Sequence, residues 1–248
     1  MLTDAHCHPY DFQEHKQTGV LAAASACTLK EFIYNEKLPD VLPCFGIHPQ
    51  FFAQRTQETQ SEDILEVLEK LAQEKRLAAV GECGFDLYSD EFKETEILQE
   101  KFFALQLDIV LKYDLPIVLH VRRAMSKLSI HIKKLAKCKA VVFHSWPGTY
   151  DEALYFLRYG VNVYFSFGNI VMLNHKRAIK CCSLLPAERL LTETDMPYAP
   201  RQGEKNSSWN DLPLILETIA ALRSEAGNKI DTKELETQIE INFKNVFI

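Results

Sequence analysis

The hydrophobic positions of the chain fall into short runs at wide intervals. Several runs are rich in β-branched residues, and most are hydrophobic almost without interruption. Continuous hydrophobicity over so few residues is typical of a strand that is buried on both faces. We therefore predict eight strands, over residues 1–6, 19–25, 41–48, 77–83, 115–121, 140–145, 161–167 and 189–195.

Helical periodicity occupies several of the intervals between these runs. Ser61 is the predicted N-cap of one helix, because acidic residues and then regularly spaced leucines follow it. Gly160 suits the position just beyond a helix end, and Asp231 with Glu234 forms a capping-box pattern. The predicted helices cover residues 62–75, 94–114, 150–160 and 212–227, and a last one starts at Asp231.

Strands that alternate with helices predict a parallel sheet, and eight of them predict a closed (β/α)8 barrel of the TIM type. No repeat, low-complexity tract or linker divides the chain, so we expect residues 1–248 to form a single domain. The turn-rich segment 199–211 follows the last strand, and we expect it to form a rim or lid at an active site.

Composition narrows the class of protein. The chain has 248 residues, of which 47% are hydrophobic and 25% charged, which is ordinary for a globular protein. The net charge of −6 makes any nucleic-acid binding depend on a local basic patch. Seven scattered cysteines without a C-x-x-C pair predict neither a disulfide framework nor a thiolate zinc site. Without a signal peptide or a membrane-spanning run, we expect a soluble, cytoplasmic protein.

Potential metal ligands lie at the carboxyl ends of the predicted strands. His6 and His8 are two residues apart, so strand alternation directs both side chains to the same face. In a barrel the carboxyl ends of all strands surround one mouth, where active sites are built. His15, His131 and His175 lie elsewhere and are predicted to be surface residues. The residues at strand ends are His6, His8, His48, Glu82, His120, His144 and Asp195.

This donor set indicates more than one metal ion. Taken singly, a histidine in the core, a glutamate at a helix cap or an aspartate in a turn has a structural explanation. Four of these histidines with the two carboxylates already exceed the ligands of one catalytic tetrahedral metal, and suit two ions bridged by a carboxylate. Nitrogen and oxygen donors accept zinc, manganese or magnesium.

Seven motifs occur in an order that is similar to a known family. They are "DAHCH", "GIHP", "GECGFD", "LPIVLHVRRA", "VVFHSWPG", "YFSFG" and "LLTETDMPYAP". The sequence resembles the TatD family of metal-dependent deoxyribonucleases, which belong to the amidohydrolase-like barrels. The resemblance implies a two-metal site and exonuclease trimming of DNA from its 3′ end, with single-stranded ends as the expected partner and no obligate protein partner.

The resemblance also implies roles for single residues. His48 and Arg122 match positions that contact the substrate phosphate. Asp195 would accept the proton of the attacking water, so the expected catalytic residues are Asp195, Glu82 and His48. One metal ion would be held by His6, His8, Glu82 and Asp195, and the other by Glu82, His120 and His144, with Glu82 as the bridge.

Two further features bear on a DNA substrate. A basic segment free of acids begins at the expected mouth and could hold phosphates, although a solvated helix face explains it equally well. It contains Arg122, Arg123, Lys127, Lys133, Lys134, Lys137 and Lys139. Five aromatic residues near strand ends could stack on bases or simply pack in loops. They are Phe85, Tyr88, Trp146, Tyr198 and Trp209.

Two other functions stay open. One is a hydrolase of the same barrel that acts on a small amide or ester, and the other is a metal-dependent DNA-binding protein without catalytic activity. Cys7 and Cys83 adjoin expected ligands, but alternation should turn their side chains away from the site.

Overall fold

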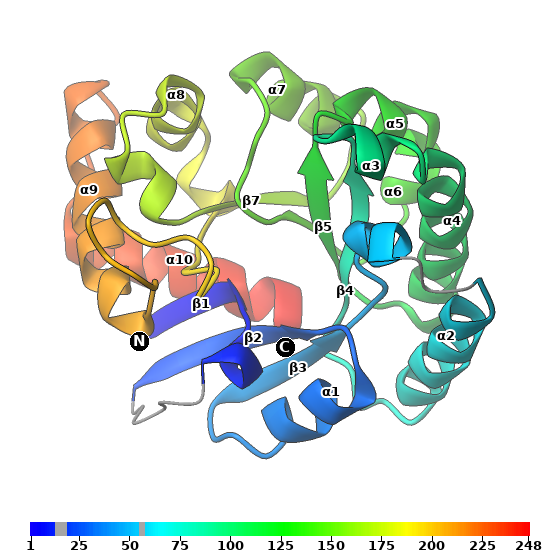
Figure 1. The fold of residues 1–248 in the computed structure, drawn as a ribbon. Coiled ribbons are helices and arrows are strands. Elements are labelled where there is room, and N and C mark those ends of the chain that lie inside the picture. The colour runs from blue at the N-terminus through cyan, green and yellow to red at the C-terminus, as the bar shows by residue number, and fades with distance from the viewer. Residues whose placement is uncertain (13–18, 55–57) are drawn as a thin grey trace.

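A parallel eight-stranded barrel forms the centre of the protein (Figure 1). The computed structural model describes residues 1–12, 19–54 and 58–248. Each strand pairs in parallel with the next one along the chain, so the predicted (β/α)8 architecture is confirmed. The strands are β1 (Leu2–Cys7), β2 (Val20–Ala26), β3 (Val41–Phe45), β4 (Ala79–Asp86), β5 (Ile117–Arg122), β6 (Val141–Phe143), β7 (Val163–Phe167) and β8 (Leu190–Thr192).

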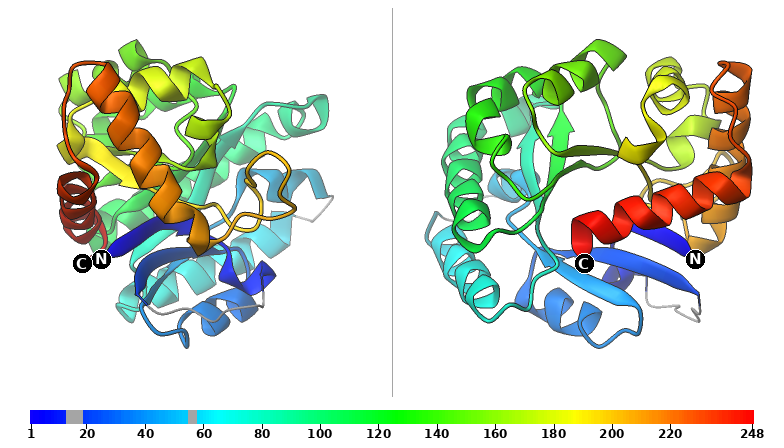
Figure 2. Two further views of the ribbon diagram at one scale, coloured as in Figure 1. Left: turned by 90° about the vertical axis from the view of Figure 1, so that its left-hand side faces the viewer. Right: turned by 180° about the vertical axis from the view of Figure 1, so that it is seen from behind.

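Helices surround this barrel on its outer side (Figures 1 and 2). Gly160 follows the end of α7 with a φ of 75°, and the Asp231 side chain caps α10, as predicted. The helices are α1 (Leu29–Asn35), α2 (Glu58–Gln73), α3 (Asp90–Lys93), α4 (Glu96–Tyr113), α5 (Met125–Ile130), α6 (Ile132–Leu135), α7 (Tyr150–Arg158), α8 (Lys176–Leu184), α9 (Leu212–Glu225) and α10 (Thr232–Phe247).

The predicted N-cap Ser61 is wrong. Helix α2 begins at Glu58, so Ser61 lies inside its first turns, where it is fully buried. The residues just before Ser61 include glutamate and glutamine, which favour helix, and no glycine or proline stops the helix from extending upstream.

Backbone hydrogen bonds join the segment after β8 to the end of β1 at the mouth of the barrel. The backbone N–H of Asp195 donates to the carbonyl of His6 at 2.9 Å, and that of His8 donates to the carbonyl of Met196 at 2.8 Å. These bonds place residues at the end of the first strand beside residues that follow the last strand. Asp195 therefore lies next to both N-terminal histidines.

The opposite end of the barrel is covered by α10, which crosses it in the view from behind (Figure 2). Phe243, Val246 and Phe247 pack there against small residues of the strands, such as Ala5 and Ala23. The end of the barrel that α10 does not cover is therefore the carboxyl-end mouth. Within the described residues, no helix is long and apolar enough to cross a membrane.

Candidate active site

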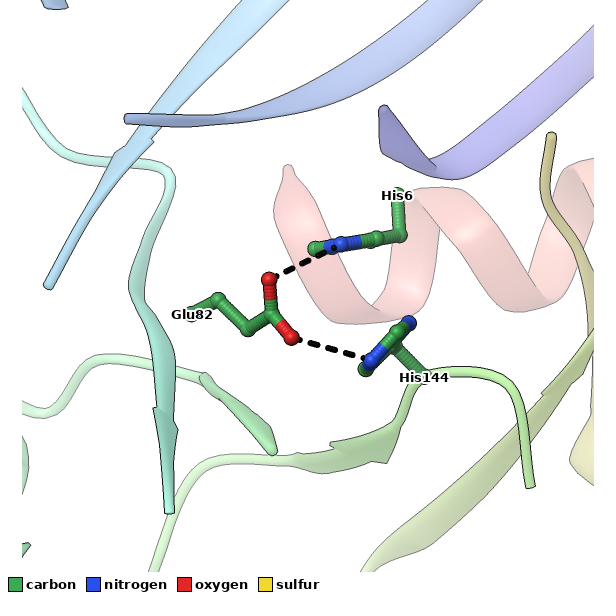
Figure 3. Close-up of side chains that lie close together, drawn as sticks. All are labelled: His6, Glu82 and His144. Carbon is green, nitrogen blue, oxygen red and sulfur yellow. Dashed lines mark ion pairs between the residues drawn. The ribbon is translucent and has the colours of Figure 1, made fainter. Parts of the chain in front are cut away.

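Glu82 occupies the centre of the site, and its two oxygens face different histidines. Oε2 lies 3.2 Å from Nε2 of His6 and 3.6 Å from Nε2 of His8. Oε1 lies 2.9 Å from Nε2 of His144 and 2.7 Å from Nδ1 of His120. Figure 3 shows the carboxylate between His6 and His144. One buried side chain of β4 thus joins donors from β1, β5 and the end of β6.

His6, His8 and Asp195 form a group on the Oε2 side. The two Nε2 atoms of His6 and His8 lie 3.1 Å apart, as alternation along β1 predicts. Asp195 Oδ1 lies 3.6 Å from each of these nitrogens. Asp195 follows β8 with a φ of 48°, a left-handed conformation that is uncommon outside glycine. These atoms, with Glu82 Oε2, surround one point.

A second group lies on the Oε1 side. Nδ1 of His120 is 3.3 Å from Nε2 of His144 and 3.3 Å from Nε2 of His48. The Nε2 atom of His48 also lies 3.4 Å from Oε1 of Glu82. His48, expected to contact phosphate, is therefore also close enough to the other donors to share a metal ion with Glu82 and His120.

Close packing between β4 and β5 depends on glycine. Gly84 pairs with His120 across the two strands and has a φ of 136°. A Cβ atom at this position would lie 2.2 Å from the carbonyl oxygen of His120, which no side chain permits. Glycine at this position therefore allows the strand that carries Glu82 to approach the strand that carries His120.

A layer of polar residues supports these side chains from behind, and the sequence analysis assigned it no role. Asp86 Oδ2 accepts from Nε2 of His120 at 3.1 Å and from the Gln50 side chain at 2.7 Å. Ser25 Oγ lies 3.2 Å from Nδ1 of His6. Glu193 accepts from the backbone N–H of Ser145 at 2.7 Å, and its Oε1 lies 3.7 Å from Nδ1 of His144.

Alternation along β4 was the available signal for Asp86, since residues 82, 84 and 86 share one face. The same alternation correctly turned two cysteines away from the site. Cys7 packs among apolar residues that include Met196, and Cys83 belongs to the main hydrophobic core.

Burial and mutual proximity shift the pKa values of this cluster. Burial raises the pKa of Asp195 to about 6, and it lowers that of His8 to about 3, with the charge of His6 adding to the effect. Burial alone would raise the pKa of Glu82, but the surrounding histidines hold it well below its usual range. For His144 the carboxylates of Glu82 and Glu193 outweigh burial and raise the pKa.

The donor set fits divalent cations. Imidazole nitrogens of neighbouring histidines lie 3.1–3.3 Å apart, and they surround the carboxylate of Glu82. Nitrogen and oxygen donors without sulfur are the ligands that zinc and manganese accept.

A cavity of about 820 Å³ opens beside these donors. Its lining includes Tyr198 at the mouth and apolar side chains such as Leu29, Ile64 and Val67. A volume in this range accommodates a ligand of drug or nucleotide size. An ion pair joins the two ends of the segment 199–211, because Nε of Arg201 lies 2.8 Å from Oδ1 of Asp211.

Only part of the predicted basic segment reaches this mouth. Arg122 and Arg123 follow His120 and lie at the carboxyl end of β5. Lys127 and Lys134 form ion pairs with Glu96 and Asp108 of α4. Lys137 and Lys139 come just before β6 and so lie at the closed end of the barrel. The segment therefore begins at the mouth, as expected, and the distal lysines follow the other interpretation, a solvated helix face.

Three of the five aromatic residues near strand ends pack inside the protein and are not placed to stack on bases. Phe85 and Trp146 are completely buried and Trp209 is nearly so, because each packs back into the protein core. Tyr88 and Tyr198 are 49% and 61% exposed, so burial does not exclude stacking for these two.

The three histidines predicted to be on the surface have different outcomes in the structure. His131 is not a surface residue, since its side chain is 11% exposed and lies 2.6 Å from a carboxylate oxygen of Glu100. Helix α4 packs over it, which the local sequence could not reveal. His175 is half-buried and caps α8. His15 lies outside the described residues.

Comparisons with known proteins identify relatives of this chain. A protein from Pantoea ananatis, named 3′-5′ ssDNA/RNA exonuclease TatD, is 30% identical over 212 residues, which is 82% of this chain and 76% of that protein. A protein from Mycoplasma pneumoniae, named an uncharacterized metal-dependent hydrolase, is 29% identical over 270 residues, 98% of each chain.

Solved structures show the same fold. The TatD homologue YjjV of Escherichia coli superimposes with a TM-score of 0.83 at 24% identity, covering 99% of this chain and 97% of that one. The family model for TatD related DNase matches residues 3–248. The chain therefore belongs to the family of TatD-related DNases.

Proposed function

We propose that this protein is a metal-dependent hydrolase that removes nucleotides from the 3′ ends of single-stranded nucleic acid. The observation that carries the proposal is the position of Glu82, whose two oxygens face separate groups of histidines beside an open cavity. A carboxylate between two donor groups is the arrangement by which proteins hold two metal ions for phosphodiester hydrolysis.

The proposed ligands divide between the two oxygens of Glu82. His6, His8 and Asp195 would hold one divalent ion with Oε2, and His120 and His144 the other with Oε1. Magnesium, manganese and zinc are the candidates. When bound, such ions supply Lewis acidity, which neutralises phosphate charge and makes hydroxide available at neutral pH.

The protein's own residues would bind the substrate and move the proton. Asp195, whose pKa is raised to about 6 by burial, is suited to accept a proton from the attacking water. The planar guanidinium of Arg122 can donate paired hydrogen bonds to a phosphate at the mouth. His48 lines the cavity, with its Nε2 atom 3.4 Å from Oε1 of Glu82, and can orient the same phosphate there.

The substrate class rests on the relatives and on the charge at the mouth. The name of the Pantoea ananatis protein specifies single-stranded DNA and RNA, cleaved from 3′ to 5′. In this chain the arginines at the end of β5 supply positive charge where a nucleic-acid backbone would enter. A nucleic-acid substrate is therefore favoured over a small amide or ester.

The test is nucleotide release from single-stranded DNA labelled at one end or the other. Purified protein is treated with chelator, then given magnesium, manganese or zinc, and compared with His120→Ala and with His175→Asn. The second variant removes a histidine outside the cluster and supplies another good N-cap. We expect metal-dependent release from the 3′ end by the unmodified protein and by His175→Asn, but not by His120→Ala.

Two outcomes would contradict the proposal. Hydrolysis of small esters without release from any nucleic acid would indicate a small-molecule hydrolase of the same fold. Tight DNA binding without turnover under every metal would indicate a binding protein.

A further inference from the structure

Two arginines at the mouth share one exposed tyrosine ring. The guanidinium carbon of Arg122 lies 4.2 Å from the centroid of the Tyr88 ring, and that of Arg123 lies 4.5 Å from the same centroid. Both distances are within the range of cation–π attraction. Two positive charges are thus gathered on one side chain that is about half exposed.

The backbone fixes this cluster beside the proposed active site. The N–H of Tyr88 donates to Asp86 Oδ1 at 2.9 Å, and the N–H of Leu87 donates to the carbonyl of Arg122 at 2.8 Å. Asp86 Oδ2 also accepts from His120. Tyr88 and Arg122 are therefore connected to the metal-ligand cluster through a single carboxylate.

The two arginines differ in their counter-charges. Nη1 of Arg122 lies 3.6 Å from Asp86 Oδ2, so its charge is partly balanced. Within residues 1–12, 19–54 and 58–248, no carboxylate forms an ion pair with Arg123. Arg123 also holds a φ of 54° directly after β5, a conformation that costs energy in a non-glycine residue and is concentrated at functional sites. An unbalanced guanidinium held in this way is suited to an anionic ligand.

We infer that Arg123 and Tyr88 form a second phosphate-binding subsite, next to Arg122, which holds the phosphate adjacent to the one that is cleaved. This inference rests on the proposed function and adds to it a preference for substrates with at least two phosphates. Arg123 donates hydrogen bonds to the second phosphate, and the Tyr88 ring holds its guanidinium in place.

The kinetic test compares two substrates. Bis(p-nitrophenyl) phosphate has one phosphate, and a single-stranded oligonucleotide has many. For Arg123→Ala we expect KM for the oligonucleotide to rise about tenfold more than KM for the one-phosphate ester, since one charge-assisted hydrogen bond is lost. Lys137→Ala removes the same charge at the closed end of the barrel and should change neither KM. An equal effect on both substrates, or none on the oligonucleotide, would overturn the inference.

A binding test needs no turnover. The affinity for the oligonucleotide is measured in chelator over a range of salt concentrations. Each phosphate neutralised on a single strand adds about 0.7 to the slope of log affinity against log salt, so Arg123→Ala should reduce that slope by about 0.7. A protein that binds but never cleaves would contradict the proposed function, while the slope would still decide the subsite. An unchanged slope would show that Arg123 only packs against Tyr88.

Discussion

Oδ2 of Asp86 accepts a hydrogen bond from Nε2 of His120 at 3.1 Å, and this contact directs Nδ1 of the same ring toward Oε1 of Glu82, 2.7 Å away. A carboxylate behind a histidine ligand fixes which nitrogen faces the metal and makes that nitrogen more basic. Burial alone would raise the pKa of Asp86, but its hydrogen bonds to His120 and Gln50 lower it to about 2. Asp86 is therefore ionised at neutral pH and is ready for this role.

Replacing this carboxylate should weaken metal binding. In Asp86→Asn the amide oxygen can still accept from the Tyr88 backbone, but the negative charge behind His120 is lost. We expect metal affinity to fall by roughly 10- to 100-fold, measured by competition with a chelator. Asp90→Asn, an exposed change in α3, serves as the control. Equal affinities for the two variants would mean that Asp86 has only a structural role.

Metal loading should release protons. Burial alone would lower the pKa of His120, but its hydrogen bonds to Asp86 and Glu82 raise it, and the pKa of His144 is raised as well. Raised pKa values favour the protonated rings in the metal-free protein, and a ligand nitrogen must lose its proton. Metal affinity should therefore increase with pH. Calorimetry in buffers of different ionisation heat measures the release, and identical heats in all buffers would contradict it.

The sequence placed the principal site residues together because two general rules combine. Alternation along a strand aligned His6 with His8, and the barrel brought the carboxyl ends of distant strands to one mouth. Both rules depend only on local pattern and strand order. The short helices α5 and α6 have six and four residues, too few for a helical period to be recognised.

Features that depend on tertiary packing were not predictable. The distal lysines looked available for DNA until α4 placed acidic residues such as Glu96 beside them. Trp146 follows a strand end just as an exposed residue would, yet its ring packs 4.8 Å from that of Phe143 and 4.7 Å from that of Phe165. The path of the connecting loop decides this direction, and the local sequence does not encode it.

Two conservative changes should separate the proposed metal positions. Among the clustered histidines, Asp195 pairs with His6 and His8, whereas Glu82 contacts both groups. We expect Asp195→Asn to retain about one metal ion per chain and to lose at least about 100-fold in kcat, and Glu82→Gln to retain neither ion. Metal content is measured by elemental analysis of folded protein. Full turnover by Asp195→Asn with its metals intact would refute the proton-acceptor role.

The closed end of the barrel should dominate stability. The Phe243 side chain of α10 is completely buried against the small residues that line this end. Removing its ring would leave a cavity, because the strands cannot move to fill the space. Phe243→Ala should lower the free energy of unfolding by about 3–5 kcal/mol, measured by urea denaturation. Ile241→Ala, on the exposed side of the same helix, should change it by less than about 0.5 kcal/mol. Similar losses of stability in the two variants would mean that the packing of α10 does not depend on its buried face.

Because α10 lies at the end opposite the mouth, turnover per folded molecule should be unchanged in both variants.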